Sequence, residues 1–197
     1  MIEVQDLHKS FATKTGLVKA VQGVSFTARD GEITGLLGPN GAGKTTTLRM
    51  LYTLMAPESG RVQVPTRELS LALVMDDVLD RQAEGFSQGQ RTTVAIARAL
   101  VHDPKNVILD EPTNGLDVMT TRGLRDFLRQ LKGEGRCVIF SSHIMQEVAA
   151  LCDRIVVIAQ GKVMAAGTPD EVRAQTGEEN LEDAFVKAIG SEEGLHA

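Results

Sequence analysis

A glycine-rich segment near residue 40 carries the first residue types whose spacing could do chemistry. Residues 38–45 read Gly-Pro-Asn-Gly-Ala-Gly-Lys-Thr and match G-x-x-x-x-G-K-[ST] at every fixed position. Glycines let backbone N–H groups converge on phosphate oxygens, and a helix that begins near Gly43 adds its positive end. In such a loop Lys44 reaches the β and γ phosphates, while the hydroxyl of Thr45 binds Mg²⁺. The residues predicted to bind nucleotide here are Gly38, Pro39, Asn40, Gly41, Ala42, Gly43, Lys44, Thr45 and Thr46.

A pair of acids, Asp110 and Glu111, follows the apolar run Val107–Leu109. A carboxylate at the carboxyl end of a parallel strand lies in the crevice where open α/β sheets bind ligands. Asp110 is then placed to hold Mg²⁺ through water, and Glu111 to activate an attacking water. The alternative is two solvated acids at a strand end, which the phosphate-binding pattern in the same chain disfavours.

The elements that must position these residues are predicted from apolar periodicity. Short apolar runs bounded by charge or glycine are typical of buried parallel strands, and they lie at 33–37, 107–109, 138–140 and 155–159. Between them lie helical patterns. One is a helix over Val118–Lys132, with Asp117 as N-cap and Gly133 just past its end. Another follows Ser142, where Ile144, Val148 and Leu151 share one face. This alternation predicts a doubly wound sheet with helices on both faces.

The two ends of the chain differ from this pattern. Ile2–Leu7 and Val18–Phe26 alternate like antiparallel strands around Gly16, which predicts a small β-layer at the edge. The tail after Ala165 is acidic, glycine-punctuated and predicted to be helical.

Composition bounds the class of protein. The 197 residues suit one α/β domain, and 42% apolar with 24% charged residues is an ordinary globular profile. A net charge of −5 lacks the basic footprint of a nucleic-acid binder. Cys137 and Cys152 are interpreted as reduced core thiols of a cytosolic protein. No run approaches the roughly 20 apolar residues of a membrane span, and the first residues lack the apolar core of a secretion signal. Neither point argues against a membrane protein as partner.

The segment Phe86–Arg91 decides which nucleotide-binding class fits best. It reads Phe-Ser-Gln-Gly-Gln-Arg and opens a helix predicted over Arg91–His102, whereas the Asn-Lys-x-Asp guanine reader of GTPases is absent. Here the chain resembles the ATP-binding cassette (ABC) family, whose signature reads roughly Leu-Ser-Gly-Gly-Gln. Ser87, Gly89 and Gln90 match that signature, and Phe86 and Gln88 depart from it. As an N-cap, Ser87 would also place an anion-binding helix start at this point.

Other family elements follow in register. Phe11 stands where the family places an aromatic residue that stacks on adenine. Asn114–Asp117 follows Glu111 as the family's D-loop does, and His143 closes the next strand as its switch histidine does. Three segments are similar in wording to the sodium-extruding, NatA-type branch of the family: 84–90, 114–118 and 142–148.

The chain departs from the family between the phosphate loop and the signature. Only 43 residues separate Lys44 from Ser87, about half the usual distance, so the glutamine of the family's Q-loop and most of its helical lobe are missing. Gln63 is the only nearby candidate for that glutamine, and its Gly-Arg-Val-Gln-Val context resembles a strand, so it is not assigned the role. The remaining stretch, Pro65–Asp80, favours one helix capped by Thr66. A strand is the alternative, because apolar residues alternate at Leu69, Leu71, Leu73 and Met75.

The resemblance implies a fold and a domain plan. The fold is a P-loop NTPase with a mainly parallel sheet flanked by helices, a small N-terminal antiparallel β-layer and a reduced helical lobe. Residues 1–197 form a single ATPase domain. Its nucleotide-binding core comprises 1–64 and 91–167, the shortened lobe with the signature spans 65–90, and a helical tail spans 168–197.

The resemblance also implies an activity: ATP hydrolysis that powers a membrane transporter, with sodium export as the solute of the similar branch. Its cofactors are ATP and Mg²⁺, the metal held by Thr45 and Asp110. Glu111 and His143 are catalytic, and Phe11, Ser87, Gly89, Gln90 and Asp117 join the phosphate loop in binding nucleotide. The expected partners are a second cassette across a nucleotide sandwich (a homodimer or pseudo-dimer) and an integral-membrane transporter subunit, not nucleic acid. That subunit would hold the chain at the inner, cytoplasmic face of the cell membrane.

Two alternatives stay open. One is a truncated cassette that binds ATP and dimerises without coupled turnover. The other is a soluble ABC ATPase of DNA repair or translation, which the acidic charge and the lack of coiled-coil or linker insertions disfavour.

Overall fold

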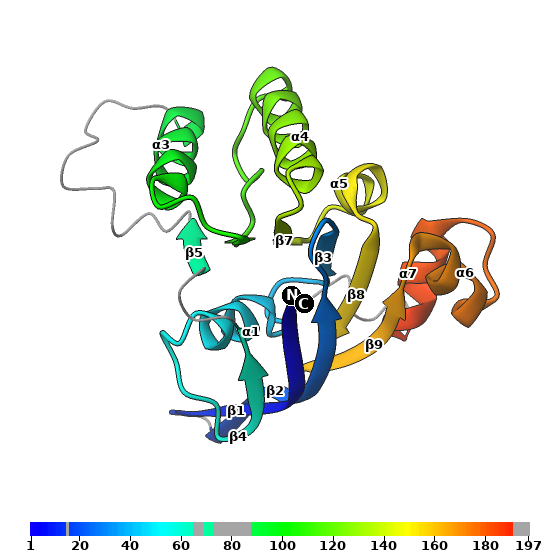
Figure 1. The fold of residues 1–197 in the computed structure, drawn as a ribbon. Helices are drawn as coiled ribbons and strands as arrows, with labels where there is room; N and C mark the ends of the chain where they lie inside the picture. The colour runs from blue at the N-terminus through cyan, green and yellow to red at the C-terminus, as the bar shows by residue number, and fades with distance from the viewer. Residues whose placement is uncertain (15, 65–68, 73–87, 191–197) are drawn as a thin grey trace.

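The computed structural model describes residues 1–14, 16–64, 69–72 and 88–190, which form two sheets and the helices around them (Figure 1). The smaller sheet has the order β2-β1-β4 and is antiparallel. Its strands are β1 (Ile2–Thr13), β2 (Gly16–Ala28) and β4 (Ser59–Gln63). The predicted N-terminal β-layer is therefore confirmed, and β4 completes it.

The larger sheet has six strands in the order β5-β6-β7-β3-β8-β9. All neighbours pair in parallel except β8 and β9, which are antiparallel. The carboxyl ends of β3, β6 and β7 therefore meet at one edge of this sheet. The strands are β3 (Ile33–Leu37), β5 (Leu69–Ala72), β6 (Asn106–Leu109), β7 (Cys137–Ser142), β8 (Arg154–Ala159) and β9 (Lys162–Gly167).

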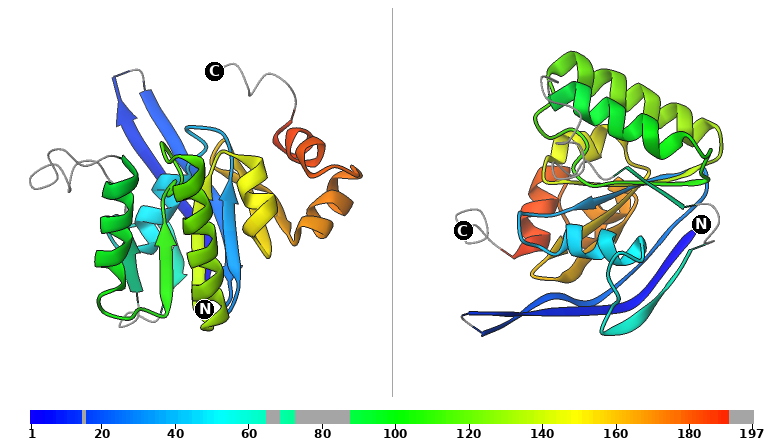
Figure 2. Two further views of the ribbon diagram at one scale, coloured as in Figure 1. Left: turned by 90° about the horizontal axis from the view of Figure 1, so that it is seen from above. Right: turned by 90° about the vertical axis from the view of Figure 1, so that its left-hand side faces the viewer.

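The molecule is layered (Figure 2). α3, α4 and α5 cover one face of the six-stranded sheet, and one apolar cluster fills the space between them and the strands. α1 lies on the other face, between this sheet and the small β-layer, and a second apolar cluster fills that space. Because both faces are covered, β3, β6 and β7 are buried at every residue, as their continuous apolar runs predict. The helices are α1 (Lys44–Leu51), α3 (Gln88–Leu100), α4 (Val118–Gly133), α5 (Met145–Leu151), α6 (Pro169–Thr176) and α7 (Leu181–Ile189).

α4 shows how local sequence sets an element. Asp117 is its N-cap and accepts a hydrogen bond from the backbone N–H of Thr120 at 2.8 Å, as predicted. Leu124, Leu128 and Leu131 are buried on one face, against the sheet. The predicted end is one residue short, because Gly133 is the last residue of the helix and not the first beyond it.

Two other elements differ from the prediction, and one agrees with it. α3 spans Gln88–Leu100, so both its first and its last residue come earlier in the chain than those of the helix predicted over 91–102. The tail becomes helical only after β9, a strand that the apolar periodicity of the sequence does not indicate. Gln63 ends β4 and pairs with Glu3, which agrees with its strand-like context.

The helix favoured for Pro65–Asp80 is wrong where the structure describes this stretch. Residues Leu69–Ala72 form β5, which pairs in parallel with β6. The strand alternative, based on alternating apolar residues, is correct there. β6 offers a row of backbone donors and acceptors on its outer side, and pairing with that row outweighs a weak local helix preference.

The expected burial of both cysteines is confirmed. Cys137 and Cys152 are buried free cysteines, and burial raises the pKa of both thiols, that of Cys137 to about 12.

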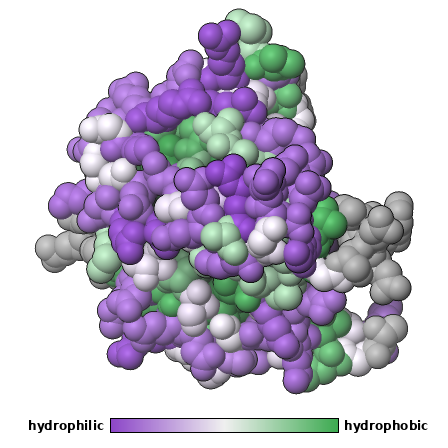
Figure 3. Space-filling view, turned by 90° about the vertical axis from the view of Figure 1, so that its right-hand side faces the viewer, coloured by the Kyte–Doolittle hydropathy of each residue, from purple (hydrophilic) through white to green (hydrophobic). Residues whose placement is uncertain are grey.

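Within the described part of the chain, no helix has both the length and the apolar character that a membrane crossing requires. Figure 3 shows the face that carries α6 and α7, which is mainly hydrophilic with apolar side chains in small separate patches.

Candidate functional site

The phosphate-binding loop joins β3 to α1 at the edge where the parallel strands end. Two of its glycines are required by close packing. A Cβ on Gly38 would lie 2.1 Å from the carbonyl oxygen of Ile158, and one on Gly43 would lie 2.2 Å from that of Ala20. Gly43 also has φ of 100°, in the region that favours glycine. The backbone can therefore approach its neighbours closely and leave the start of α1 open.

The first turn of α1 suits a bound anion. Its N-cap, Gly43, makes no side-chain capping bond, and the turn contains no acidic residue. Thr45 and Thr46 lie half-buried in this turn. The helix start thus offers backbone N–H groups and a positive dipole end to phosphate, as the motif predicts.

Lys44 opens α1, and its side chain is only 5% exposed. Its Nζ donates hydrogen bonds to the carbonyl oxygens of Gly38 at 2.8 Å and Pro39 at 3.1 Å. The ammonium group is thus held over the loop that it belongs to, within reach of a phosphate cradled there.

The acids lie directly beyond β6, next to the phosphate loop. Glu111 has φ of 47°, which is uncommon for a residue with a side chain and marks a constrained backbone. The hydroxyl of Ser141, a fully buried residue of β7, holds both acids. Its Oγ accepts from the Glu111 backbone N–H at 2.9 Å and donates to Oδ1 of Asp110 at 2.5 Å.

Glu111 links Lys44 of the phosphate loop to His143. Its Oε1 lies 3.3 Å from Nζ of Lys44, and its Oε2 lies 2.7 Å from Nδ1 of His143. The structure thus brings together three residues that the sequence assigned separately, from α1 and from the ends of β6 and β7. A carboxylate and a cation beside a phosphate-binding loop are groups that phosphoryl transfer to water can use, to orient the water and to neutralise the phosphate.

Magnesium fits this donor set only together with a phosphate ligand. Among the described residues no group of three or more His, Cys, Asp or Glu side chains could hold a metal ion alone. Mg²⁺ is ordinarily bound by one or two carboxylates, water and substrate phosphates. Thr45 and Asp110 match that incomplete set.

Tyr52 ties the helix of the phosphate loop to the strand of the acids. It directly follows α1 and donates from its hydroxyl to the carbonyl oxygen of Ile108 in β6 at 2.6 Å. Burial, and secondarily the negative charge of Asp110, raise the pKa of this phenol well above its ordinary value. Neither Tyr52 nor Ser141 was assigned a role from the sequence. Ser141 had one available signal: it lies next to the last residue of β7, the strand beside the one that precedes Asp110.

The other predicted nucleotide-binding residues lie outside this cluster. Phe11 is on β1, 37% exposed, with Nζ of Lys9 at 5.9 Å from its ring centroid. Asp117 caps α4, and hydrogen bonds from Thr120 lower the pKa of its exposed carboxyl. Gly89 and Gln90 belong to the first turn of α3, and Ser87 lies outside the described residues.

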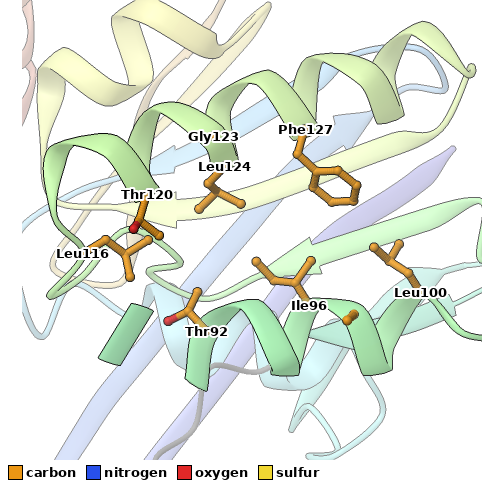
Figure 4. A pocket seen from close by; sticks show the side chains of 9 residues that line it. Thr92, Ile96, Leu100, Leu116, Thr120, Gly123, Leu124 and Phe127 are labelled. Carbon is orange, nitrogen blue, oxygen red and sulfur yellow. The ribbon is translucent and has the colours of Figure 1, made fainter. Parts of the chain in front are cut away.

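An apolar groove runs between α3 and α4, on the far side of the sheet from α1 (Figure 4). Its volume is about 440 Å³. Two threonine hydroxyls, those of Thr92 and Thr120, lie toward one end, and aliphatic side chains and Phe127 line the rest. Such a lining gives no cation or base for phosphate chemistry. Its lining residues are Thr92, Ile96, Ala97, Leu100, Leu116, Thr120, Gly123, Leu124 and Phe127.

Comparison with known proteins gives consistent relatives. The family profile described as ABC transporter matches residues 21–72 and 66–114. The ABC transporter ATP-binding protein NatA of Bacillus subtilis is 34% identical over 96% of this chain and 98% of its own length. The Nod factor export ATP-binding protein I of Burkholderia lata is 32% identical over 85% of this chain and 71% of its own.

Solved structures show the same fold. One described as the ATP-binding subunit of an ABC transporter superposes with a TM-score of 0.80 at 24% identity, over 95% of this chain and 99% of its own. A dimeric, post-hydrolysis structure of the cassette MJ0796 with ADP and Pi gives 0.76 at 20% identity, over 85% and 98%.

The same comparisons bear on the shortened stretch. The alignment with the Bacillus NatA protein runs over 241 positions, although this chain has 197 residues, so that relative carries residues that this chain lacks. The family profile matches in two pieces that meet at residues 66–72. This is the stretch where the spacing of Lys44 and Ser87 indicated missing residues.

Proposed function

This chain belongs to the ABC transporter family as an ATP-binding subunit, and from that premise we propose that it binds Mg²⁺-ATP and hydrolyses it to drive a membrane transporter. The observation that carries the proposal is the position of Glu111 between Lys44 and His143, at the mouth of the phosphate loop. Family membership alone supports nucleotide binding; this cluster supports hydrolysis.

In the proposed binding mode the phosphates lie on residues 38–46. The backbone N–H groups at the start of α1 and the Lys44 ammonium neutralise the β and γ phosphates. Mg²⁺, when bound, would be held by Thr45 and Asp110 and would neutralise charge on the phosphate oxygens. Ser141 keeps Asp110 directed to this place through its hydroxyl.

Hydrolysis requires a water in line with the bond between the γ phosphorus and its bridging oxygen. Glu111 would accept a proton from that water as its oxygen attacks the phosphorus and the bond to ADP breaks. His143 would donate a hydrogen bond to the γ phosphate, and Lys44 would stabilise the charge that develops on its oxygens. Both partners already contact the Glu111 carboxylate, so the three groups share one site.

We further propose a head-to-tail dimer in which Ser87, Gly89 and Gln90 of one copy close on the γ phosphate held by Lys44 of the other. Phe11 would stack on the adenine and Asp117 would face the shared site. The dimeric MJ0796 cassette with ADP and Pi supports such an assembly. Mixing Ser87→Arg with Lys44→Ala tests it, because one composite site in the hetero-pair carries neither lesion. Mixed samples should regain ATP-dependent dimer, and their failure to do so would argue against the arrangement.

The transported solute is proposed from relatedness alone. The resemblance to NatA supports sodium export, with an integral-membrane subunit as partner and the cytoplasmic face of the membrane as location. A second candidate is a cassette that binds ATP and dimerises without coupled turnover. The residues missing relative to NatA favour this candidate, since the stretch between the phosphate loop and the signature is the one shortened.

Steady-state phosphate release from Mg²⁺-ATP tests the proposed hydrolysis. Glu111→Gln keeps the shape of the side chain but removes the base, so kcat should fall by about 10²- to 10⁴-fold while ATP binding persists. The matched control is Glu179→Gln, at an exposed position before α7, which should retain the wild-type rate. If Glu111→Gln hydrolyses ATP as fast as wild type, Glu111 is not the base. If wild type binds ATP without turnover, the second candidate is correct.

A further inference from the structure

Glu147 is a buried carboxylate that the proposed reaction does not use. It lies in the first turn of α5 and is only 6% exposed. Among the described residues no Lys, Arg or His lies within ion-pair distance of it. A buried charge is costly unless hydrogen bonds satisfy it, so its partners indicate its role.

Those partners are two hydroxyl groups on one carboxylate oxygen. Oε2 of Glu147 accepts from Oγ1 of Thr113 at 2.6 Å and from Oγ of Ser142 at 3.0 Å. Hydrogen bonds to an ionised acceptor are about twice as strong as neutral ones. Glu147 therefore fixes both hydroxyl-bearing residues to the start of α5.

The two anchored residues flank the catalytic pair in sequence. Thr113 lies two residues after Glu111, and Ser142 directly precedes His143. The Ser142 hydroxyl also accepts from the backbone N–H of Ile144 at 3.0 Å, so the chain is held on both sides of His143. Glu147 thus connects the loop that carries Glu111 with the loop that carries His143. These are the two residues whose Oε2 and Nδ1 atoms lie 2.7 Å apart.

We propose that Glu147 is a positioning residue for ATP hydrolysis: it holds the Glu111 loop and the His143 loop in register through Thr113 and Ser142. This inference rests on the proposed function, because it assigns Glu147 to the geometry of that reaction. The Ser141 hydroxyl in β7 hydrogen-bonds to both acids, and the Glu147 carboxylate in α5 hydrogen-bonds to Thr113 and Ser142.

Comparison of Glu147→Ala with Glu147→Gln tests the role. Alanine removes the acceptor, so kcat should fall by about 10- to 100-fold, the usual cost of losing an outer partner of a site. KM for ATP should stay unchanged, because the phosphate loop is untouched. Glutamine keeps one oxygen that can accept both hydroxyls, so it should restore kcat close to wild type. A merely structural role would lower the melting temperature of Glu147→Ala without this split between kcat and KM.

Thr113→Val removes the hydroxyl that donates to Glu147 and keeps the side-chain volume nearly constant. Its effect on kcat should not add to that of Glu147→Ala, because both variants break the same contact. It also carries the test if Glu147→Ala does not fold. Wild-type kcat in Glu147→Ala or Thr113→Val, or fully additive losses, would overturn the proposal.

A readout without turnover separates this inference from the proposed function. In ¹⁵N spectra of the histidine rings, the Nδ1 signal of His143, assigned by its loss in His143→Gln, reports the contact with Glu111. Glu147→Ala and Thr113→Val should shift that signal, and Glu147→Gln should not. If wild type proves inactive but the shifts occur, the positioning role stands and the proposed hydrolysis fails. If hydrolysis is present and the signal is unmoved, the positioning role fails alone.

Discussion

Nζ of Lys44 lies 3.3 Å from Oε1 of Glu111, so the cation of the phosphate loop is ion-paired with the proposed base. The side chains are 5% and 21% exposed, respectively, which limits screening by solvent. The same ammonium also donates to two carbonyl oxygens of its own loop. A γ phosphate that engages Lys44 therefore competes with Glu111 for it. Nucleotide binding and release of the carboxylate to a water are thereby linked.

Lys44→Ala should lower the affinity for Mg²⁺-ATP by about 100-fold or more, because charge-assisted hydrogen bonds contribute about 1.5–3 kcal/mol each. Isothermal titration calorimetry measures the affinity directly. Lys187→Ala makes the same substitution in α7, where the side chain pairs with Glu178 on the surface, and should bind ATP normally. Equal affinities for wild type and Lys44→Ala would contradict the assignment of the phosphate loop.

Ser141→Ala should impair both stability and turnover. It leaves the part-buried backbone N–H of Glu111 without its partner, which costs about 1 kcal/mol, and it frees Asp110 to move. Urea unfolding measures the first effect and phosphate release the second. The matched control is Ser25→Ala, since the exposed Ser25 hydroxyl also accepts a backbone N–H, from Asp6. Water replaces that bond, so the control should lose less stability and no activity.

These contacts show which parts of the molecule the sequence predicts. Apolar runs locate the central strands, and β3 has the predicted bounds because its five residues are buried between two layers. The glycine spacing likewise locates the phosphate loop. The hydrogen bonds of Ser141 escape prediction because they join residues 30 and 31 positions apart. For β5 the sequence favours a helix and keeps the strand as an alternative, because pairing with β6, which local sequence does not reveal, decides the conformation.

Alkaline pH should destabilise the fold through its buried thiols. Burial raises the pKa of Cys137 from 9.0 to about 12, so above pH 9 the unfolded chain loses a proton that the native state keeps. The native state then binds more protons, and the free energy of unfolding falls as pH rises from 9 toward 12. Between pH 8 and pH 10 this thiol should contribute a loss of about 1 kcal/mol. Urea unfolding of wild type and Cys137→Ala at both values gives the difference. An equal pH dependence in the two proteins would contradict the argument.

The shortened stretch before the signature should limit turnover more than binding. Lys44, Asp110 and His143 are positioned by β3, β6 and β7, whose contacts lie within the described core. ATP binding should therefore be clear. The signature, however, follows Lys44 by only 43 residues, and in the family the missing lobe holds it at the right distance from the partner's nucleotide. We expect weak basal hydrolysis.

The residues that the Bacillus subtilis NatA protein carries and this chain lacks, inserted between residues 64 and 86, should raise the hydrolysis rate and the ATP-dependent dimer fraction together. Phosphate release and light scattering measure the two effects. An insertion of equal length made of Gly and Ser is the control, because it lengthens the tether without supplying a packed lobe. It should leave the rate low and the dimer fraction unchanged. If the unaltered chain already hydrolyses ATP as fast as the chimera and dimerises as fully, the short stretch places the signature adequately, and the lobe is dispensable for turnover.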